Sequence, residues 1–249
     1  MRMKRLHYSL SETDRDHPDE AWTSVLWDHD GMWHSARDNE LVSEACRILT
    51  AGYVIAVPTD TVYGLAALVQ NTSAINSMYQ IKGRDPNKPV AICLSQVEDI
   101  EKWAKVDDLP PKLLSALLPG KVTVILERKP LLNAALNPGN PKVGIRVPGS
   151  DFIRNIVDQV QQPVALTSAN SSSETSSLQA EEFKHLWPHI GAVFCDDSNL
   201  KNEELRAGST IIDLSVKGHY SVIRKGVCLA AVREKLKMFE LVEGSAGLF

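Results

Sequence analysis

Threonine and aspartate side chains gather in the stretch "VPTDTVYGLA" (57–66), directly after an apolar run. Hydroxyls and a carboxylate are costly to bury without hydrogen-bond partners, and open α/β sheets place ligands at the carboxyl ends of their strands. We therefore interpret this stretch as a candidate ligand-binding loop. The structural alternative is a loop whose side chains bond only to their own backbone.

Cations crowd into a second stretch, "KGRDPNKP" (82–89). Arginine grips phosphate with two parallel hydrogen bonds and lysine acts as a point charge, so this segment suits a polyphosphate or a nucleic-acid backbone. We expect the loop to be exposed. A solvated run of charge is the alternative, but the glycine and proline residues that frame the cations favour a shaped loop.

Hydroxyl and amide groups follow a third apolar run, in "TSANSSSETSS" (167–177), and two arginines, Arg146 and Arg224, lie within apolar strand patterns. The hydroxyls and Asn170 could surround a ribose, a phosphate or an amino acid. An arginine inside such a strand is costly unless it meets an anion, either a ligand or the partner in a structural salt bridge. These groups include no nucleophile–base pair, and they suit positioning and charge neutralisation, as in nucleotidyl transfer.

Composition restricts the class of protein. The 249 residues are 43% hydrophobic with a formal net charge of −4, and no apolar run reaches 18 residues, which predicts a globular protein without membrane contact. Four widely spaced cysteines predict reduced thiols inside the cell. We expect a cytoplasmic protein. The basic start "MRMKRLHYSL" leaves a mitochondrial pool open.

Hydrophobic periodicity predicts alternating helices and strands around these stretches. Helices are expected at 38–52, 72–82, 111–118, 150–160, 178–187 and 229–240, and strands at 53–57, 90–94, 122–126, 143–147, 163–167, 191–195, 209–214 and 220–224. Strands twice follow one another without a helix, which predicts an α/β fold with a mixed sheet. We expect an N-terminal extension over 1–37, one domain over 38–240 and a tail over 241–249.

Seven stretches come in the order found in the YrdC-like family, and the chain resembles its animal members over about residues 40–228. They are "VPTDTVYGLA", "KGRDPNKP", "LLPGKVTVILE", "VGIRVP", "LTSANSSS", "GSTIIDLS" and "VIRKG". The resemblance implies a twisted mixed sheet with flanking helices and a basic concave face. It also implies a nucleotidyltransferase that condenses L-threonine, bicarbonate or CO2, and ATP into L-threonylcarbamoyladenylate and pyrophosphate.

The resemblance also implies roles for individual residues. Lys82 and Arg84 match the pair that meets the nucleotide phosphates and carries the catalytic role. Thr59, Thr61, Arg146 and Ser209 would lie on the threonine side. The nucleotide side would add Lys88, Ser168, Asn170, Ser176 and Arg224.

Partners follow from the same resemblance. Mg2+ would arrive with ATP, because no clear motif ligates a metal, and a downstream threonylcarbamoyl transferase complex would modify adenosine 37 of tRNA. A direct tRNA contact stays open. The long acidic stretch 196–206 departs from the family's usual short turn. The alternatives are an RNA-binding module without catalysis and a carbamoyl-transferring maturation enzyme. The first would use the cations but has no use for a pocket of hydroxyls, and the second usually bears zinc and acylphosphatase modules that are not visible here.

Overall fold

One mixed sheet organises the part of the chain that the computed structural model describes, residues 3–8, 22–24, 34–83, 88–172, 174–196 and 202–244. Twelve strands lie in the order β12-β11-β10-β6-β7-β5-β8-β4-β3-β9-β1-β2. In chain order they are β1 (Met3–Tyr8), β2 (Trp22–Ser24), β3 (Ile55–Val57), β4 (Gly64–Leu68), β5 (Ala91–Cys93), β6 (Val122–Glu127), β7 (Lys142–Arg146), β8 (Val164–Ser168), β9 (Ala192–Asp196), β10 (Thr210–Asp213), β11 (His219–Arg224) and β12 (Val242–Glu243).

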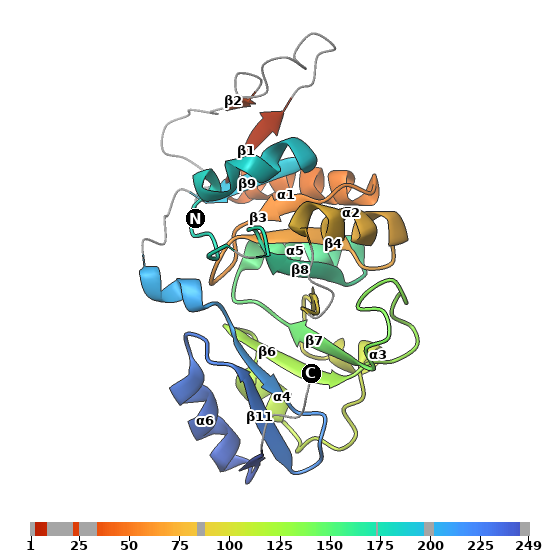
Figure 1. Cartoon of the computed structure of the whole chain (residues 1–249), viewed down its shortest axis with the longest axis vertical. Coiled ribbons are helices and arrows are strands. Elements are labelled where there is room, and N and C mark those ends of the chain that lie inside the picture. The colour runs from red at the N-terminus through yellow and green to blue at the C-terminus, as the bar shows by residue number, and fades with distance from the viewer. Residues whose placement is uncertain are drawn as a thin grey trace.

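Helices flank the sheet along its length. They are α1 (His34–Thr50), α2 (Thr72–Lys82), α3 (Ile100–Trp103), α4 (Leu113–Leu117), α5 (Asp151–Val160) and α6 (Leu229–Met238), with 3₁₀ segments η2 (Ala180–His189) and η3 (Glu203–Ala207). Figure 1 shows α1, α2 and α5 around the upper half of the sheet and α4 and α6 beside its lower half. The mixed α/β sheet with flanking helices that the sequence predicts is confirmed.

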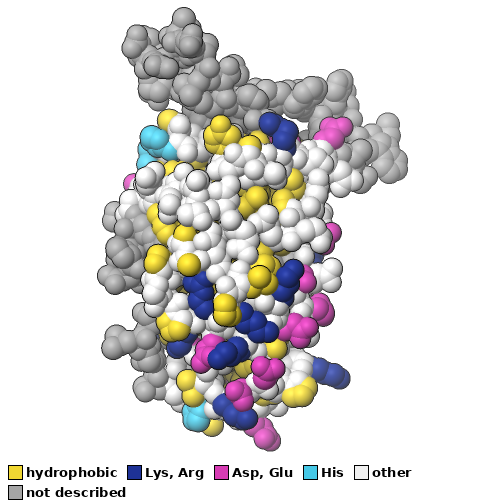
Figure 2. Space-filling view, turned by 90° about the vertical axis from the view of Figure 1, so that its right-hand side faces the viewer, with side chains coloured by type: hydrophobic (Ala, Val, Ile, Leu, Met, Phe, Trp, Pro, Cys, Tyr) yellow, Lys and Arg dark blue, Asp and Glu magenta, His cyan; other side chains and the backbone are white. Residues whose placement is uncertain are grey.

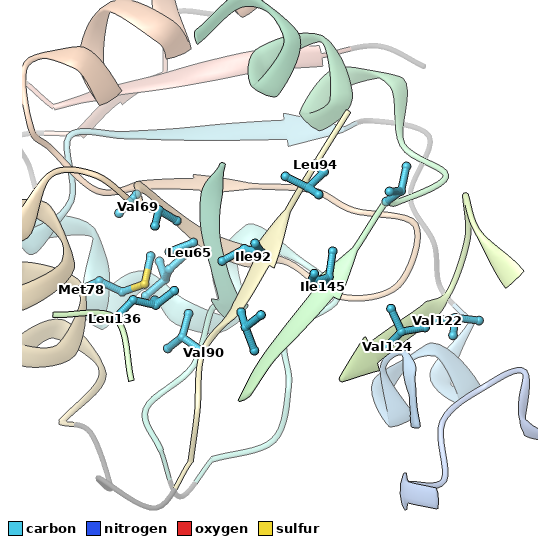
Figure 3. Packing of buried hydrophobic residues seen from close by; sticks show 14 of the residues in the cluster. Leu65, Val69, Met78, Val90, Ile92, Leu94, Val122, Val124, Leu136 and Ile145 are labelled. Atoms are coloured by element: carbon cyan, nitrogen blue, oxygen red, sulfur yellow. The ribbon is translucent and has the colours of Figure 1, made fainter. Parts of the chain in front are cut away.

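Two apolar cores hold the layers together. In the larger one, Leu65 of β4 lies beside Met78 of α2, and Ile92 of β5 and Ile145 of β7 continue the apolar layer across the sheet (Figure 3). The second core lies under α1 and α5 on the opposite face, where the rings of Phe152 and Phe194 pack with their centroids 5.4 Å apart. A sheet buried on both faces explains why its central strands read as nearly continuous apolar runs.

Local signals fixed several helix ends and missed others. The side chain of Asn71 accepts a hydrogen bond from Ala74 N, and Gly83 ends α2 with φ 52°, as expected of a glycine after the last helical residue. Helix α1 begins at His34, four residues before the expected start at 38. The expectation that Pro188 ends its helix is wrong, since the proline lies inside η2.

Strand β4 is one of the four strands that periodicity missed, the others being β1, β2 and β12. Its sequence "GLAAL" follows the polar stretch directly and is buried along its whole length. It forms because both its neighbours pair with it, β3 and β8, each antiparallel. Its first residue needs to be glycine, because a Cβ on Gly64 would lie 2.6 Å from Leu166 Cδ1. The polar stretch is therefore the 58–63 connection of a hairpin.

Candidate active site

The hairpin connection 58–63 is held in shape by its own hydroxyls. Thr59 Oγ1 donates to Val62 O at 2.7 Å and accepts from Thr61 N at 3.1 Å. The two threonine hydroxyls lie 3.2 Å apart, and both residues are buried. This is the structural alternative that the sequence left open, and it is realised here. A ligand that reached these hydroxyls would meet groups already fixed in place.

Arg146 meets the anion that its position in a buried strand requires. It lies at the end of β7 with its side chain 8% exposed, and its Nη2 forms an ion pair with the carboxylate of Asp60. The same Nη2 donates to Thr61 Oγ1 at 2.9 Å, and Asp60 Oδ2 accepts from Gly149 N at 2.9 Å. The salt bridge therefore ties the 58–63 connection to the edge of the sheet.

The strand register places Arg146 in a row with three other positions. On β6, Thr123 lies opposite Arg146, because the next pair along is Val124 with Ile145. On β10, Ile211 pairs with Thr123. On β11, Arg224 pairs with Ile211. Side chains in such a row share one face of the sheet. Ser209 belongs to the same face, since its Oγ lies 2.8 Å from Thr123 Oγ1. We call Arg146, Asp60, Thr123, Ser209 and Arg224 the arginine face.

Arg224 is fixed by Ser209 and influenced by Arg146. Its Nε donates to Ser209 O at 3.0 Å and its Nη2 to Ser209 Oγ at 2.9 Å, while the residue remains exposed. Loss of hydration and the charge of Arg146 together lower the pKa of Arg224. The two guanidinium groups therefore act on one another across the same face. An anion placed between them would relieve that repulsion.

Lys82 forms the second cluster. Its ammonium donates to Ser168 O at 2.7 Å and to Asn170 O at 2.5 Å, with Asn170 Oδ1 at 3.3 Å and Ser168 Oγ at 3.5 Å. Its backbone carbonyl accepts from Ser172 N and from Ser172 Oγ. We call Lys82, Ser168, Asn170 and Ser172 the lysine cluster. It joins the end of α2 to the loop after β8.

The exposure expected for the cation loop is wrong at Lys82, which is only 8% exposed. The pKa of Lys82 is lowered to about 8, mainly by burial and also by the nearby charge of Lys88, against an opposite effect of Glu174. The contacts closest to the ammonium are uncharged carbonyls, which leave its charge uncompensated. Arg84 belongs to the residues outside the described part of the chain.

The two clusters adjoin one another. Gly64 at the start of β4 pairs with Ser168 at the end of β8. Beyond that pair, Ala169 N donates to Tyr63 O and Tyr63 N donates to Ser177 O, each at 2.8 Å. Antiparallel pairing of β4 and β8 brings the 58–63 loop and the loop after β8 to the same edge of the sheet.

Two further predicted residues lie around the lysine cluster. Lys88 is exposed, and its Nζ donates to Ser172 O at 3.0 Å. Ser176 is half-buried, and its carbonyl accepts from Arg206 Nη1 at 2.9 Å. Arg206 in turn pairs with Glu182 and Glu203. The end of the long acidic stretch is thereby fastened to the loop after β8.

Four residues of the site were assigned no individual role from the sequence: Asp60, Thr123, Ser172 and Arg206. The sequence did hold a signal for Asp60 as the partner of Arg146. Asp60 lies between Thr59 and Thr61, and Arg146 in its apolar strand needed an anion. Thr123 carried the weaker signal of a hydroxyl in an apolar strand. Nothing near Arg206 in the sequence pointed to Ser176, which lies 30 positions away.

On the face that Figure 2 presents, lysine and arginine side chains lie among aspartate and glutamate side chains in the lower half of the molecule. In the described ranges, no three histidine, cysteine, aspartate or glutamate side chains gather in a way that could hold a metal ion. Among those same residues, no helix is long and apolar enough to cross a bilayer.

Comparisons with known proteins agree on one family. The family model Sua5/YciO/YrdC, described as telomere recombination, matches residues 47–226. A Bos taurus threonylcarbamoyl-AMP synthase is 43% identical over 206 residues, 82% of this chain and 74% of the relative. The Homo sapiens protein of the same name is 45% identical over 193 residues, 76% of this chain and 68% of the relative.

A solved structure shares the fold. Pyrococcus abyssi Sua5 complexed with L-threonine aligns with a TM-score of 0.68 at 23% identity, over 82% of this chain and 58% of that one. At that identity the likeness speaks for the fold alone.

Proposed function

The chain belongs to the Sua5/YciO/YrdC family, and from this premise we propose that it is a threonylcarbamoyl-AMP synthase. It condenses L-threonine, bicarbonate or CO2, and ATP into L-threonylcarbamoyladenylate and pyrophosphate, which makes it a nucleotidyltransferase. The observation that carries the proposal is that two different charge arrangements adjoin at one edge of the sheet. Lys82 forms no ion pair with any described residue, whereas Arg146 and Asp60 form a neutral ion pair.

The lysine cluster suits the phosphates of ATP. The charge of Lys82 is held by carbonyl oxygens, and its two longer contacts, 3.3 Å to Asn170 Oδ1 and 3.5 Å to Ser168 Oγ, are ones a phosphate oxygen could displace. A phosphate would give the ammonium the charged partner that it lacks. Lys88 supplies a second cation on the exposed side, and Arg84, Ser176 and Arg224 complete the proposed nucleotide side.

The arginine face suits an amino acid. The pair formed by Arg146 and Asp60 is neutral overall, and a zwitterion meets a neutral pair without a net electrostatic penalty. Thr59 and Thr61 hold their hydroxyls at the same place, and Ser209 adds a third. A hydroxyl-bearing substrate such as threonine would find both charge and hydrogen-bond partners there.

The chemistry then requires placement more than covalent help. The threonine amine captures CO2 to form a carbamate, and a carbamate oxygen attacks the α-phosphorus of ATP while pyrophosphate leaves. Fixed donors around the attacking and leaving groups lower the barrier by orientation and by charge stabilisation. Lys82 would stabilise the charge that develops on the leaving pyrophosphate.

Mg2+ would enter with ATP. It prefers near-octahedral oxygen coordination and keeps waters and phosphate oxygens among its ligands. The described side chains offer no cluster that could hold the ion by themselves. Its contribution when bound would be to neutralise phosphate charge, and the nucleotide would be its main anchor.

Later steps lie outside this chain. A threonylcarbamoyl transferase complex would consume the adenylate and modify adenosine 37 of tRNA, in the cytoplasm and in any mitochondrial pool. Direct contact of this protein with tRNA is a separate proposal, and the face that Figure 2 presents carries no uniformly basic surface for it. An RNA-binding module without catalysis would leave unexplained why Lys82 is buried among oxygen atoms and away from the exposed surface.

The test is a reaction with purified protein. We expect pyrophosphate release to require ATP, bicarbonate and threonine together, and to run faster with threonine than with serine or valine. A pocket that reads a hydroxyl rejects an analogue that lacks it, because the fixed groups are left unpaired. Equal rates with valine would contradict a hydroxyl-reading pocket. Stabilisation by RNA, without turnover, would favour the binding module.

A further inference from the structure

Asp60 stands inside the candidate site without a role in the reaction described above. Its carboxylate is 12% exposed, and both oxygens are engaged. Oδ1 pairs with Arg146 Nη2, and Oδ2 accepts from Gly149 N at 2.9 Å. A Cβ on Gly149 would lie 3.1 Å from Oδ2, so the backbone closely encloses the carboxylate.

The contacts of Asp60 determine which donors of Arg146 remain for a ligand. Nη2 has two hydrogens, and both are used, one toward Asp60 and one toward Thr61 Oγ1. Nη1 makes no hydrogen bond to any described residue, and Nε is buried without a partner. Because two acceptors bind the same nitrogen, the guanidinium plane cannot rotate without losing one of them. The unused donors are held in one direction.

We propose that Asp60 is a positioning residue for the amino-acid substrate. It fixes the guanidinium of Arg146 through Nη2, so that the remaining donors face the substrate carboxylate, and it keeps this half of the site neutral for a zwitterion. The inference rests on the proposed function, which it deepens by naming what holds the threonine side in place. It gives Asp60 no contact with the reacting atoms.

The variant Asp60→Asn tests this role. The amide keeps the shape and can still accept from Gly149 N, but its charge is lost and the ion pair with Arg146 is broken. We expect the KM for threonine to rise about 10-fold, the scale on which misplaced positioning groups act. The KM for ATP should stay unchanged, because the lysine cluster does not contact Asp60.

Asp213→Asn is the matched control. Asp213 is also buried on this sheet face, pairs with Lys142 at 2.7 Å and accepts from Ser215 N at 2.9 Å. Its removal therefore costs stability in the same way, through a broken buried ion pair. Both variants should melt at a lower temperature than the wild type, and only Asp60→Asn should change the KM for threonine. An equal change in both variants, or in neither, overturns the proposal.

A second variant, Gly149→Ala, keeps the negative charge of Asp60 but displaces its carboxylate. Gly149→Ala pushes against Asp60 Oδ2 and should raise the KM for threonine by less than Asp60→Asn does. If Asp60→Asn fails to fold, an unchanged KM in Gly149→Ala overturns the proposal. The rise in melting temperature caused by threonine alone gives a readout without turnover. A protein that threonine stabilises, with the effect lost in Asp60→Asn, but that forms no adenylate would refute the proposed function and retain the role of Asp60.

Discussion

The lysine cluster and the arginine face hold their cations by different means. Lys82 is surrounded by the carbonyl oxygens of Ser168 and Asn170, whereas Arg146 faces the carboxylate of Asp60. Both side chains are withdrawn from water to a similar degree, 8% and 6% of each residue being exposed. Among the described residues, Arg146 forms an ion pair and Lys82 does not.

Because their cations have different partners, the lysine cluster and the arginine face favour ligands of different charge. Lys82 has a pKa lowered to about 8 because burial penalises its charge and Lys88 repels it, and the opposing effect of Glu174 is the smaller one. An anion is the ligand that gains most there. Arg146 already has its counterion, so a neutral zwitterion fits better. The comparison thus assigns ATP to one cluster and threonine to the other.

Lys82→Met should have the largest effect and tests the anion half of the comparison. Removing a fixed charge at a transition state typically costs about 10²-fold in turnover. The two carbonyls would also lose their donor inside the protein, at about 1–3 kcal/mol of the free energy of unfolding. We therefore expect both turnover and melting temperature to fall, measured by pyrophosphate release and by calorimetry. Full turnover would show that Lys82 only supports the loop after β8.

Thr59→Val tests the threonine half. The substitution keeps the shape and removes the hydroxyl that binds Val62 O and Thr61 N. Leaving such partners unsatisfied costs about 1–3 kcal/mol, and the same penalty on the substrate would weaken threonine binding by roughly 5- to 150-fold. Isothermal titration should find ATP affinity unchanged. Normal threonine binding would mean that the loop 58–63 holds only itself together.

The pH dependence of ATP binding sharpens the contrast between the cations. Lys82 is charged below pH 8 and neutral above it, so ATP affinity should fall as the pH rises through about 8, approaching tenfold per pH unit. Threonine affinity should not follow while the amine of the substrate stays protonated, because the proposed threonine site does not contact Lys82. Titrations between about pH 7 and 8.5 would check this. Parallel pH profiles for the two ligands would contradict the division.

The same titration has a consequence for stability. The folded-state pKa of Lys82 lies below its ordinary value of 10.5, so between about pH 8 and 10.5 the unfolded chain binds more protons. Stability contributed by this group therefore rises with pH across that window and is lowest below pH 8. The difference in unfolding free energy between wild type and Lys82→Met should grow in favour of the wild type as the pH increases.

Lys88→Met should have the smallest effect. Lys88 is exposed, and its one described hydrogen bond reaches Ser172 O. An exposed cation contributes little to stability, about 1 kcal/mol or less, and we expect turnover to fall only severalfold. The same lysine-to-methionine change is made at both positions. The comparison therefore distinguishes the effect of losing the buried charge of Lys82 from that of losing the exposed charge of Lys88. Equal losses at both positions would contradict the special place of Lys82.

Much of the fold followed from periodicity, and what failed was decided by distant pairing. Helix α2 had a local cap at each end, Asn71 and Gly83, and was predicted to the residue. Strand β4 had no such signal, since "GLAAL" is short and small, and it becomes a strand only because β8, a hundred positions later, pairs along it. The same pairing brings the 58–63 loop beside the loop after β8, and no local signal predicts that contact.

The site shows the same limit. The residue types in the seven stretches were found from the sequence, but their contacts were not. Asp60 and Arg146 are 86 positions apart, and nothing local says that this carboxylate faces this guanidinium rather than solvent. The exposure of Lys82 was misjudged because a charged loop usually lies at the surface, whereas here its ammonium is enclosed by the carbonyls of Ser168 and Asn170.

The most direct test of the account follows carbon from bicarbonate into the product. Wild-type protein is incubated with ATP, threonine and ¹³C-labelled bicarbonate, and the products are analysed by mass spectrometry. The account predicts threonylcarbamoyl-AMP that carries the label, together with pyrophosphate, and neither product when threonine is omitted. Pyrophosphate release without the labelled adenylate, or an adenylate without the label, would contradict it.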